Sequence, residues 1–125
     1  MLHILSGGSQ NDPEKYYGKK IKRAWMEDDR FNIDFTDGVK VSIWDNGQSC
    51  CEHRYMRTDD DLGWLKGKKL EAITTKEAHS GSGEYDTHEI VFLEIMTNEG
   101  EITFSNHNVH NGYYGGFGLT ITERQ

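Results

Sequence analysis

Residues 31–35 and 39–43 alternate strictly between apolar and polar side chains. A period of two is typical of a β-strand that buries one of its faces. Asp37-Gly38 between the two runs is a favoured hairpin turn. Residues 20–26 form a further alternating run that precedes them. The sequence therefore predicts an antiparallel β-meander of three strands.

Besides this meander, the sequence predicts two short helices and several further strands. Asp12-Pro13 suits an N-cap and a first helical position, and Gly18 would end a single turn. Thr58, followed by aspartates at 59–61, predicts an N-cap and an acidic first turn in a helix that stops at Gly67. Further strands are expected over residues 90–96, 101–104 and 119–121, with loops over residues 45–57, 80–87 and 106–117.

The two halves of the chain resemble each other. Gly18-Lys19-Lys20-Ile21 and Gly67-Lys68-Lys69-Leu70 each follow a short helix and lead into a strand, a second strand, a turn and a third strand. We therefore expect a β-rich α+β fold, with an antiparallel sheet built from two duplicated short-helix-β-β-β units. Residues 1–125 would form a single domain, with copies at about 12–57 and 58–122 and a loosely held N-terminus at 1–11. The alternative is coincidence, because helix, glycine, strand and hairpin often follow one another.

Composition limits the partners and the compartment. Only 34% of the residues are hydrophobic and the formal charge is −7. We therefore expect a thin core completed by homo-oligomerisation, and no binding to duplex nucleic acid or to anionic membranes. The adjacent Cys50 and Cys51 cannot build a disulfide framework, which favours a reducing, cytoplasmic compartment. No run approaches the roughly 18 apolar residues of a membrane span, and residues 1–10 lack the pattern of a signal peptide.

Two segments of unusual composition follow the expected third strand of each unit. Residues 45–57 and 106–117 are rich in His, Asn, Gly, Tyr and Arg, and loops on a rigid scaffold commonly carry function. If the repeat is real, these segments are equivalent and converge at one end of the sheet. The candidate ligand-binding residues are Glu52, Arg54, Tyr55, Arg57, His107, Asn108, His110, Asn111, Tyr113 and Tyr114. The alternative is that both segments pack on each other and close the sheet edge.

Several strings within these segments are long and unusual: Asp45-Asn46-Gly47-Gln48-Ser49-Cys50-Cys51-Glu52, Arg54-Tyr55-Met56, residues 58–62, His107-Asn108 and residues 110–117. They resemble a family of small proteins of tailed phages and their bacterial hosts that is catalogued as a domain of unknown function. The resemblance covers residues 35–121 and implies an interaction or counter-defence protein in the cytoplasm of a bacterial host. Some phage-borne proteins of this kind take up nucleotide immune signals. The resemblance implies no catalytic mechanism.

The leading hypothesis is a non-enzymatic binding protein that sequesters a small anionic, nucleotide-like signal, such as a cyclic nucleotide or an ADP-ribose-type ligand. The tyrosines would stack on a base, and Arg54 and Arg57 would hold a phosphate without a cofactor. Pairing of either arginine with the aspartates at 59–61 is the structural alternative. An inhibitor that binds a host protein directly, with surface acids that mimic nucleic acid, is the second hypothesis.

Metal binding and catalysis are the remaining hypotheses. Cys51, His107 and His110 offer sulfur and imidazole ligands for zinc, although paired Cys-x-x-Cys spacing is absent. Cys51 with either histidine would also make a nucleophile and its base, with Glu52 to orient the base. A pair of histidines can act as general acid and base on a phosphodiester. The sequence contains no established catalytic signature.

Overall fold

A computed structural model gives the fold for residues 12–45, 53–77, 81–82, 87–110 and 117–124. These residues form two short 3-10 helices and a series of strands. The elements are η1 (Pro13–Tyr16), β1 (Ile21–Glu27), β2 (Arg30–Phe35), β3 (Lys40–Asp45), β4 (His53–Arg57), η2 (Leu62–Leu65), β5 (Leu70–Glu77), β6 (Gly81–Ser82), β7 (Thr87–Thr97), β8 (Gly100–His110) and β9 (Leu119–Glu123). The β-meander predicted from the alternation is confirmed as β1, β2 and β3.

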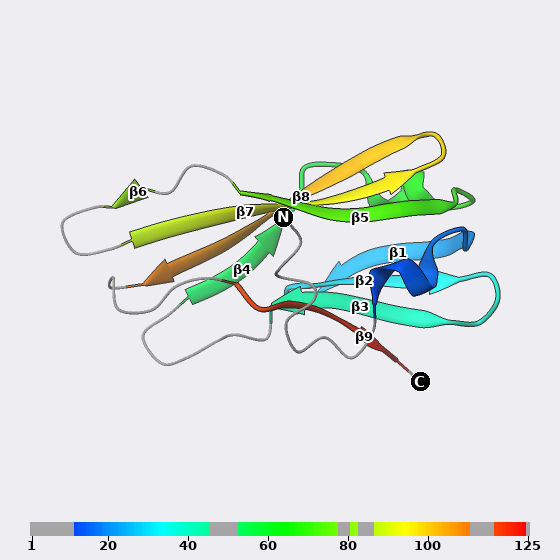
Figure 1. Cartoon of the computed structure of the whole chain (residues 1–125), viewed down its shortest axis with the longest axis horizontal. Coiled ribbons are helices and arrows are strands. Elements are labelled where there is room, and N and C mark those ends of the chain that lie inside the picture. Colours follow the sequence, from blue (N-terminus) through cyan, green and yellow to red (C-terminus); the bar gives the residue numbers. More distant parts are fainter. Residues whose placement is uncertain (1–11, 46–52, 78–80, 83–86, 111–116, 125) are drawn as a thin grey trace.

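The strands form two antiparallel sheets that lie one above the other in Figure 1. The first sheet has the order β1-β2-β3-β9, and the second has the order β4-β8-β7-β5, with β6 paired to β7. Apolar side chains from both sheets form one buried cluster, in which the rings of Phe31 and Phe104 lie 4.5 Å apart. The prediction of a β-rich antiparallel fold is therefore confirmed, but the strands form two packed sheets where one was expected.

Each sheet takes an edge strand from the other half of the chain. β9 pairs with β3, from Val41 opposite Glu123 to Asp45 opposite Leu119. In the same way β4 pairs with β8 of the second sheet. Figure 1 shows β4 and the adjoining ends of β7 and β8 extending to the left of the first sheet. This exchange places residues 53–57 beside residues 105–109.

The junctions between helix and strand pair with each other through matching hydrogen bonds. Gly18 N donates to Leu70 O, and Gly67 N donates to Ile21 O. Both glycines have a positive φ, 89° and 85°, which is a conformation that glycine adopts at no steric cost. A register shift then follows in both strands, between Ile21 and Arg23 and between Leu70 and Ala72.

Two segments predicted as loops contain strand. Residues 53–57, expected within the loop 45–57, form β4, and residues 106–110, expected within the loop 106–117, extend β8. β6 likewise lies within the loop expected at 80–87. Polar composition suggested loops here, but pairing between β4 and β8 satisfies the backbone groups and overrides that preference.

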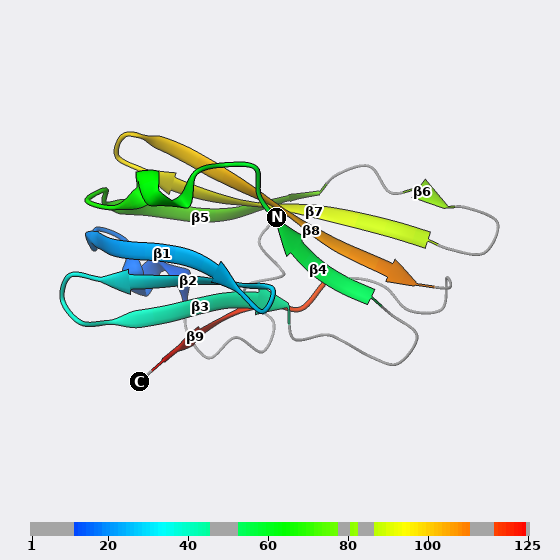
Figure 2. The same ribbon diagram turned by 180° about the vertical axis from the view of Figure 1, so that it is seen from behind.

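The second helix begins later than its sequence suggested. Asp61 is the N-cap, because its side chain accepts a hydrogen bond from Gly63 N at 2.9 Å, and η2 starts at Leu62. Thr58 and Asp60 follow the last residue of β4, and their side chains instead hydrogen-bond to the backbone of Thr103. Figure 2 shows this connection running beside the β7–β8 hairpin towards η2. The predicted cap at Thr58 was therefore wrong.

No helix among the described residues is long and apolar enough to cross a membrane. The expectation of a loosely held N-terminus at 1–11 falls outside the described residues, as do Cys50 and Cys51.

Candidate functional site

Strand alternation sorts the predicted site residues onto two faces of the second sheet. Along β8, Ile102, Phe104 and every second residue up to His110 are buried on one face, which packs on the first sheet at Phe104, and we call this the inner face. The residues between them, including Ser105 and His107, lie on the opposite side, which we call the outer face. Because β4 pairs with β8 in antiparallel register, Tyr55 and Arg57 are opposite His107 and Ser105 on the outer face. Arg54, Asn108 and His110 are on the inner face.

A stack of rings occupies the outer face. The rings of Tyr55 and His107 are 4.5 Å apart and nearly parallel, at 5°. The ring of His53 lies next to that of Tyr55, with centroids 5.0 Å apart and the planes tilted by 38°. The guanidinium carbon of Arg57 lies 4.9 Å from the centre of the Tyr55 ring, a distance suited to a cation–π interaction. The stack fixes the plane of the His107 imidazole.

Both nitrogens of His107 have polar partners on the outer face. Nδ1 lies 2.8 Å from Nε2 of His88 on β7, and Nε2 lies 2.8 Å from the hydroxyl oxygen of Ser105. His88 and Ser105 were missed by the sequence analysis, because His88 lies outside both unusual segments and Ser105 immediately precedes the second. The signal that would have found them is the register of β7 on β8, which brings His88 diagonally next to His107.

A groove of about 460 Å³ opens beside these residues. It is lined by Arg57, Thr58, Asp59, Asp60, Phe92, Thr103, Ser105 and His107. Within the described part of the chain Arg57 forms no ion pair. The groove therefore carries both an arginine without an ion pair and the carboxylates of Asp59 and Asp60.

Burial lowers the pKa of His107 below its usual value, and the nearby His88 and Arg57 lower it further because they oppose a second positive charge. The sign of the shift favours the neutral imidazole at neutral pH. A neutral His107 can accept a proton at one nitrogen while it donates from the other.

On the inner face, arginine and histidine side chains lie in buried contacts with carboxylates. Arg54, with its side chain 7% exposed, donates from one guanidinium nitrogen to both carboxylate oxygens of Asp45, at 3.0 and 2.8 Å. Asp45 also accepts from Gly118 N. His110 Nε2 lies 2.8 Å from the carboxylate of Glu89, and Asn108 is fully buried.

These placements correct the proposed phosphate clamp and zinc set. Arg54 and Arg57 cannot share one phosphate, because successive odd and even positions of a strand point to opposite faces. His107 and His110 are separated by the sheet for the same reason, so they cannot bind one ion together. Among the described residues no group of three His, Cys, Asp or Glu side chains is arranged to hold a metal. Glu52, Asn111, Tyr113, Tyr114 and Cys51 lie outside the described residues.

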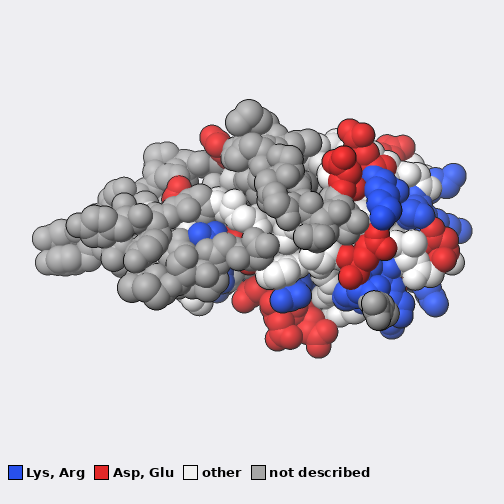
Figure 3. Space-filling model, turned by 60° about the horizontal axis from the view of Figure 1, so that its bottom comes forward, with Lys and Arg blue, Asp and Glu red and all other residues white. Residues whose placement is uncertain are grey.

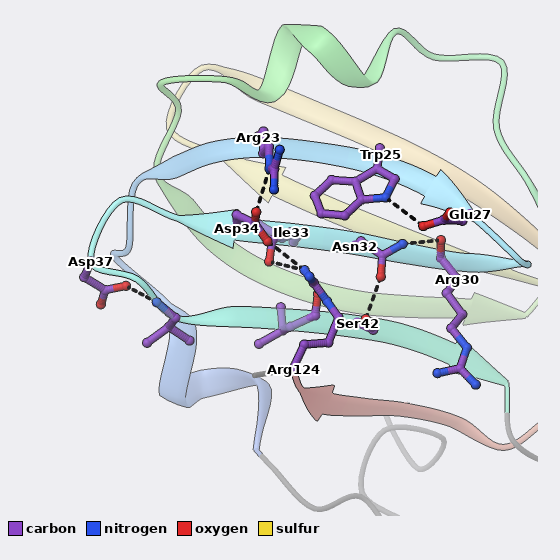
Figure 4. A network of polar contacts seen from close by, with 12 residues as sticks. Arg23, Trp25, Glu27, Arg30, Asn32, Ile33, Asp34, Asp37, Ser42 and Arg124 are labelled. Carbon is purple, nitrogen blue, oxygen red and sulfur yellow. Dashed lines mark hydrogen bonds and ion pairs between the residues drawn. The ribbon is translucent and has the colours of Figure 1, made fainter.

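The first sheet also has an outer face, which is the side away from the core, and a network of polar contacts lies there (Figure 4). Asp34 accepts from Arg23 at 2.6 Å and from Arg124 at 2.8 Å, and both guanidinium groups lie about 5 Å from the centre of the Trp25 ring. Burial opposes the ionisation of Asp34, but the hydrogen bonds from the two arginines outweigh it and lower its pKa. Hydrogen bonds and ion pairs join these side chains to one another, so the network stabilises the sheet.

Charges of both signs are interspersed over the described surface visible in Figure 3. The described residues on this side of the molecule present no extended acidic patch. This arrangement gives no support to acidic mimicry of nucleic acid by this side.

A family model described as "Domain of unknown function (DUF7448)" matches residues 14–119 of the chain. Searches of curated proteins and of solved structures each found no significant match.

Proposed function

We propose a function from the site itself, because the chain belongs to a family described as a domain of unknown function, DUF7448. The protein binds a small anionic, nucleotide-like ligand in the groove on the outer face of β4 and β8, and it thereby sequesters that ligand. The observation that carries this proposal is the stacked Tyr55–His107 pair, with Arg57 over Tyr55, at the rim of a groove of about 460 Å³.

The chemistry of the groove fits a nucleotide in two parts. Arg57 has no carboxylate partner among the described residues, and an arginine is well suited to a phosphate because its donors match the phosphate oxygens. Phe92 and the imidazole of His107 line the same groove and offer ring faces to a base. The carboxylates of Asp59 and Asp60 in the same groove would accept hydrogen bonds from base amino groups.

The experiment is calorimetric titration of the protein with cyclic mononucleotides, cyclic dinucleotides and ADP-ribose. Arg57→Ala should weaken binding about tenfold or more, because a charge-assisted hydrogen bond is lost. Arg30→Ala is the matched control, since its guanidinium carbon lies 3.9 Å over Trp44 on the outer face of the other sheet. Absence of binding at millimolar ligand, or equal effects of the two substitutions, would refute the proposal.

We also propose that the two helix–strand units arose by duplication. We further propose that the protein captures its ligand as a phage-type counter-defence factor. The matching hydrogen bonds of Gly18 and Gly67 and the matching register shifts support the duplication. The resemblance to phage proteins supports the counter-defence role. Expression in a bacterium that carries a nucleotide-triggered defence tests it: the wild-type chain should restore phage growth, and Arg57→Ala should not.

A further inference from the structure

Binding alone requires no reacting group, yet Ser105 and His107 of the groove form a hydrogen-bonded series with His88 beside it. The Ser105 hydroxyl oxygen lies 2.8 Å from Nε2 of His107, and Nδ1 of His107 lies 2.8 Å from Nε2 of His88. Two proton arrangements satisfy both contacts. In one of them Ser105 donates to His107 and His107 donates to His88, and a nucleophilic serine requires that arrangement.

The series has the connectivity of a nucleophile, a general base and an orienting group. A serine hydroxyl is a weak nucleophile until an adjacent base accepts its proton, and a third group holds the base in the correct tautomer. Here the histidine nearest the serine uses Nε2 towards the hydroxyl and Nδ1 towards the orienting group, as that chemistry needs. His88 takes the place that a carboxylate often occupies.

We propose that Ser105 is a nucleophile activated by His107, with His88 as a positioning residue, and that the groove hydrolyses a phosphodiester bond. The substrate class rests on the proposed function, since a nucleotide-like ligand supplies the phosphodiester. The nucleophile itself rests on the contacts of Ser105, His107 and His88.

The surroundings hold these groups in place and supply a counter-charge. Tyr55 stacks on the His107 imidazole and restricts its rotation. Ser105 is flanked in register by Arg57 on β4 and by Phe92 on β7. A guanidinium in the same groove as the nucleophile can stabilise the negative charge that develops on the phosphoryl oxygens during attack. Ser105, His107, Arg57 and Phe92 all line the groove, so a ligand can reach the hydroxyl.

The chemical steps balance without a metal or a redox partner. The Ser105 oxygen bonds to phosphorus while its proton passes to Nε2 of His107, and the bond from phosphorus to the leaving alcohol breaks. The alkoxide takes the proton from His107, which leaves a phosphodiester on the serine. Water then attacks phosphorus, gives a proton to His107, and releases the monoester as the Ser105 oxygen recovers its proton. One water is consumed in each cycle.

Labelling with a fluorophosphonate probe tests the nucleophile independently of any nucleotide. The probe should modify the wild-type chain once, at Ser105, as read by intact mass and peptide mapping, and Ser105→Ala should not react. His107→Gln should slow labelling by about 100-fold, the contribution typical of a general base. Labelling at another residue, or labelling at Ser105 that is insensitive to His107→Gln, would overturn the proposal.

The pH dependence of labelling distinguishes a positioning role of His88 from a purely structural one. His88→Leu should slow labelling, and His88→Asp should restore it with an acid limb moved to higher pH, because a carboxylate raises the pKa of His107. The charged or titratable groups that face His107 are His53, Tyr55 and Arg57 from β4, His88 and Glu94 from β7, and Asp59 and Asp60 from the connection to η2. An unchanged acid limb in His88→Asp would refute the role given to His88.

Hydrolysis of bis(4-nitrophenyl) phosphate tests the substrate class. The wild-type chain should release nitrophenolate and Ser105→Ala should not, and release from 4-nitrophenyl acetate alone would overturn the assignment to phosphodiesters. Calorimetry with Ser105→Ala separates the two proposals. Nucleotide binding without labelling would refute the nucleophile and would be consistent with sequestration. Labelling without nucleotide binding would refute the proposed function and would support the nucleophile.

Discussion

The two faces of the β4–β8 pair carry similar side chains and use them differently. On the inner face Arg54 and His110 lie against the carboxylates of Asp45 and Glu89. On the outer face Arg57 and His107 border a groove, and their neighbours are rings, imidazoles and a hydroxyl. This difference shows that the presence of arginine and histidine does not by itself identify a binding site. What distinguishes the outer face is that its cation has no carboxylate partner within the described residues.

The strongest test of this comparison is the pair Arg54→Met and Arg57→Met. Arg54→Met leaves the largely buried Asp45 carboxylate without its arginine, which should lower the free energy of unfolding by about 3–5 kcal/mol. Urea denaturation measures the loss. A cost below about 1 kcal/mol, or an equal cost for Arg57→Met, would break the distinction between a structural and a functional arginine.

The two histidines give the next largest contrast. His110→Ala should cost about 1–3 kcal/mol of unfolding free energy, since a side chain that is 4% exposed loses its bond to Glu89. It should leave fluorophosphonate labelling of Ser105 unchanged. His107→Ala should abolish labelling at a smaller cost in stability, because its imidazole is only half-buried. Thermal denaturation and mass spectrometry on the same samples provide both readings.

The polar network of the first sheet sharpens the comparison through its pH dependence. The pKa of Asp34 is lowered in the folded state, so its ionised form stabilises the fold above the unfolded pKa of about 4. That contribution is lost as the pH falls below this value towards the folded pKa. Asp34→Asn should therefore destabilise the protein by about 1–2 kcal/mol at pH 7, and the difference from wild type should shrink in acid.

Urea titrations at pH 7, 5 and 3.5 measure this trend. The matched control is Asp37→Asn, whose exposed ion pair with Lys19 should contribute little. A constant difference between Asp34→Asn and wild type across this range would contradict the assignment. Nucleotide binding by Asp34→Asn at pH 7 should equal that of wild type, because the network lies on the other sheet.

The smallest effect on stability is expected at the site itself. Arg57→Ala removes a cation–π contact with Tyr55 at an exposed position, which should cost no more than about 0.5–1 kcal/mol. Its effect should appear in ligand affinity, as the tenfold loss given above. A large loss of stability in Arg57→Ala would place this arginine with Arg54 and remove the contrast between the faces.

The sequence predicted the parts of the fold in which hydrophobicity alternates. Residues 31–35 and 39–43 carry that signal, and Asp37-Gly38 supplies the turn, so β2 and β3 were recognised. β4 carries no such signal because Arg54, a charged residue, is one of its inward-facing side chains. The buried asparagines at the end of β8 hide its strand character in the same way. Only pairing between distant segments makes these polar stretches into strands.

The structure places the two segments singled out by the sequence side by side, as β4 and β8, but it divides their residues between two faces. The sequence grouped Arg54 with Arg57 and His107 with His110, since residues close in the chain appear close in a loop. Strand geometry separates both pairs across the sheet. It also brings His88 next to His107 through the β7–β8 register, a contact between residues that no local pattern connects. Knowing which segments are strands was therefore the missing step.

The exchange of β4 and β9 between the sheets has a consequence for synthesis on the ribosome. β3 finds its partner β9 only after residues 119–123 have been made, so the first sheet stays one strand short until then. Contacts between such distant segments form slowly, because a long loop must close before they are gained. A nascent chain that stalls before β9 exposes the edge of β3, and unpaired edges invite aggregation. A strand from the second half of the chain thus completes the first sheet.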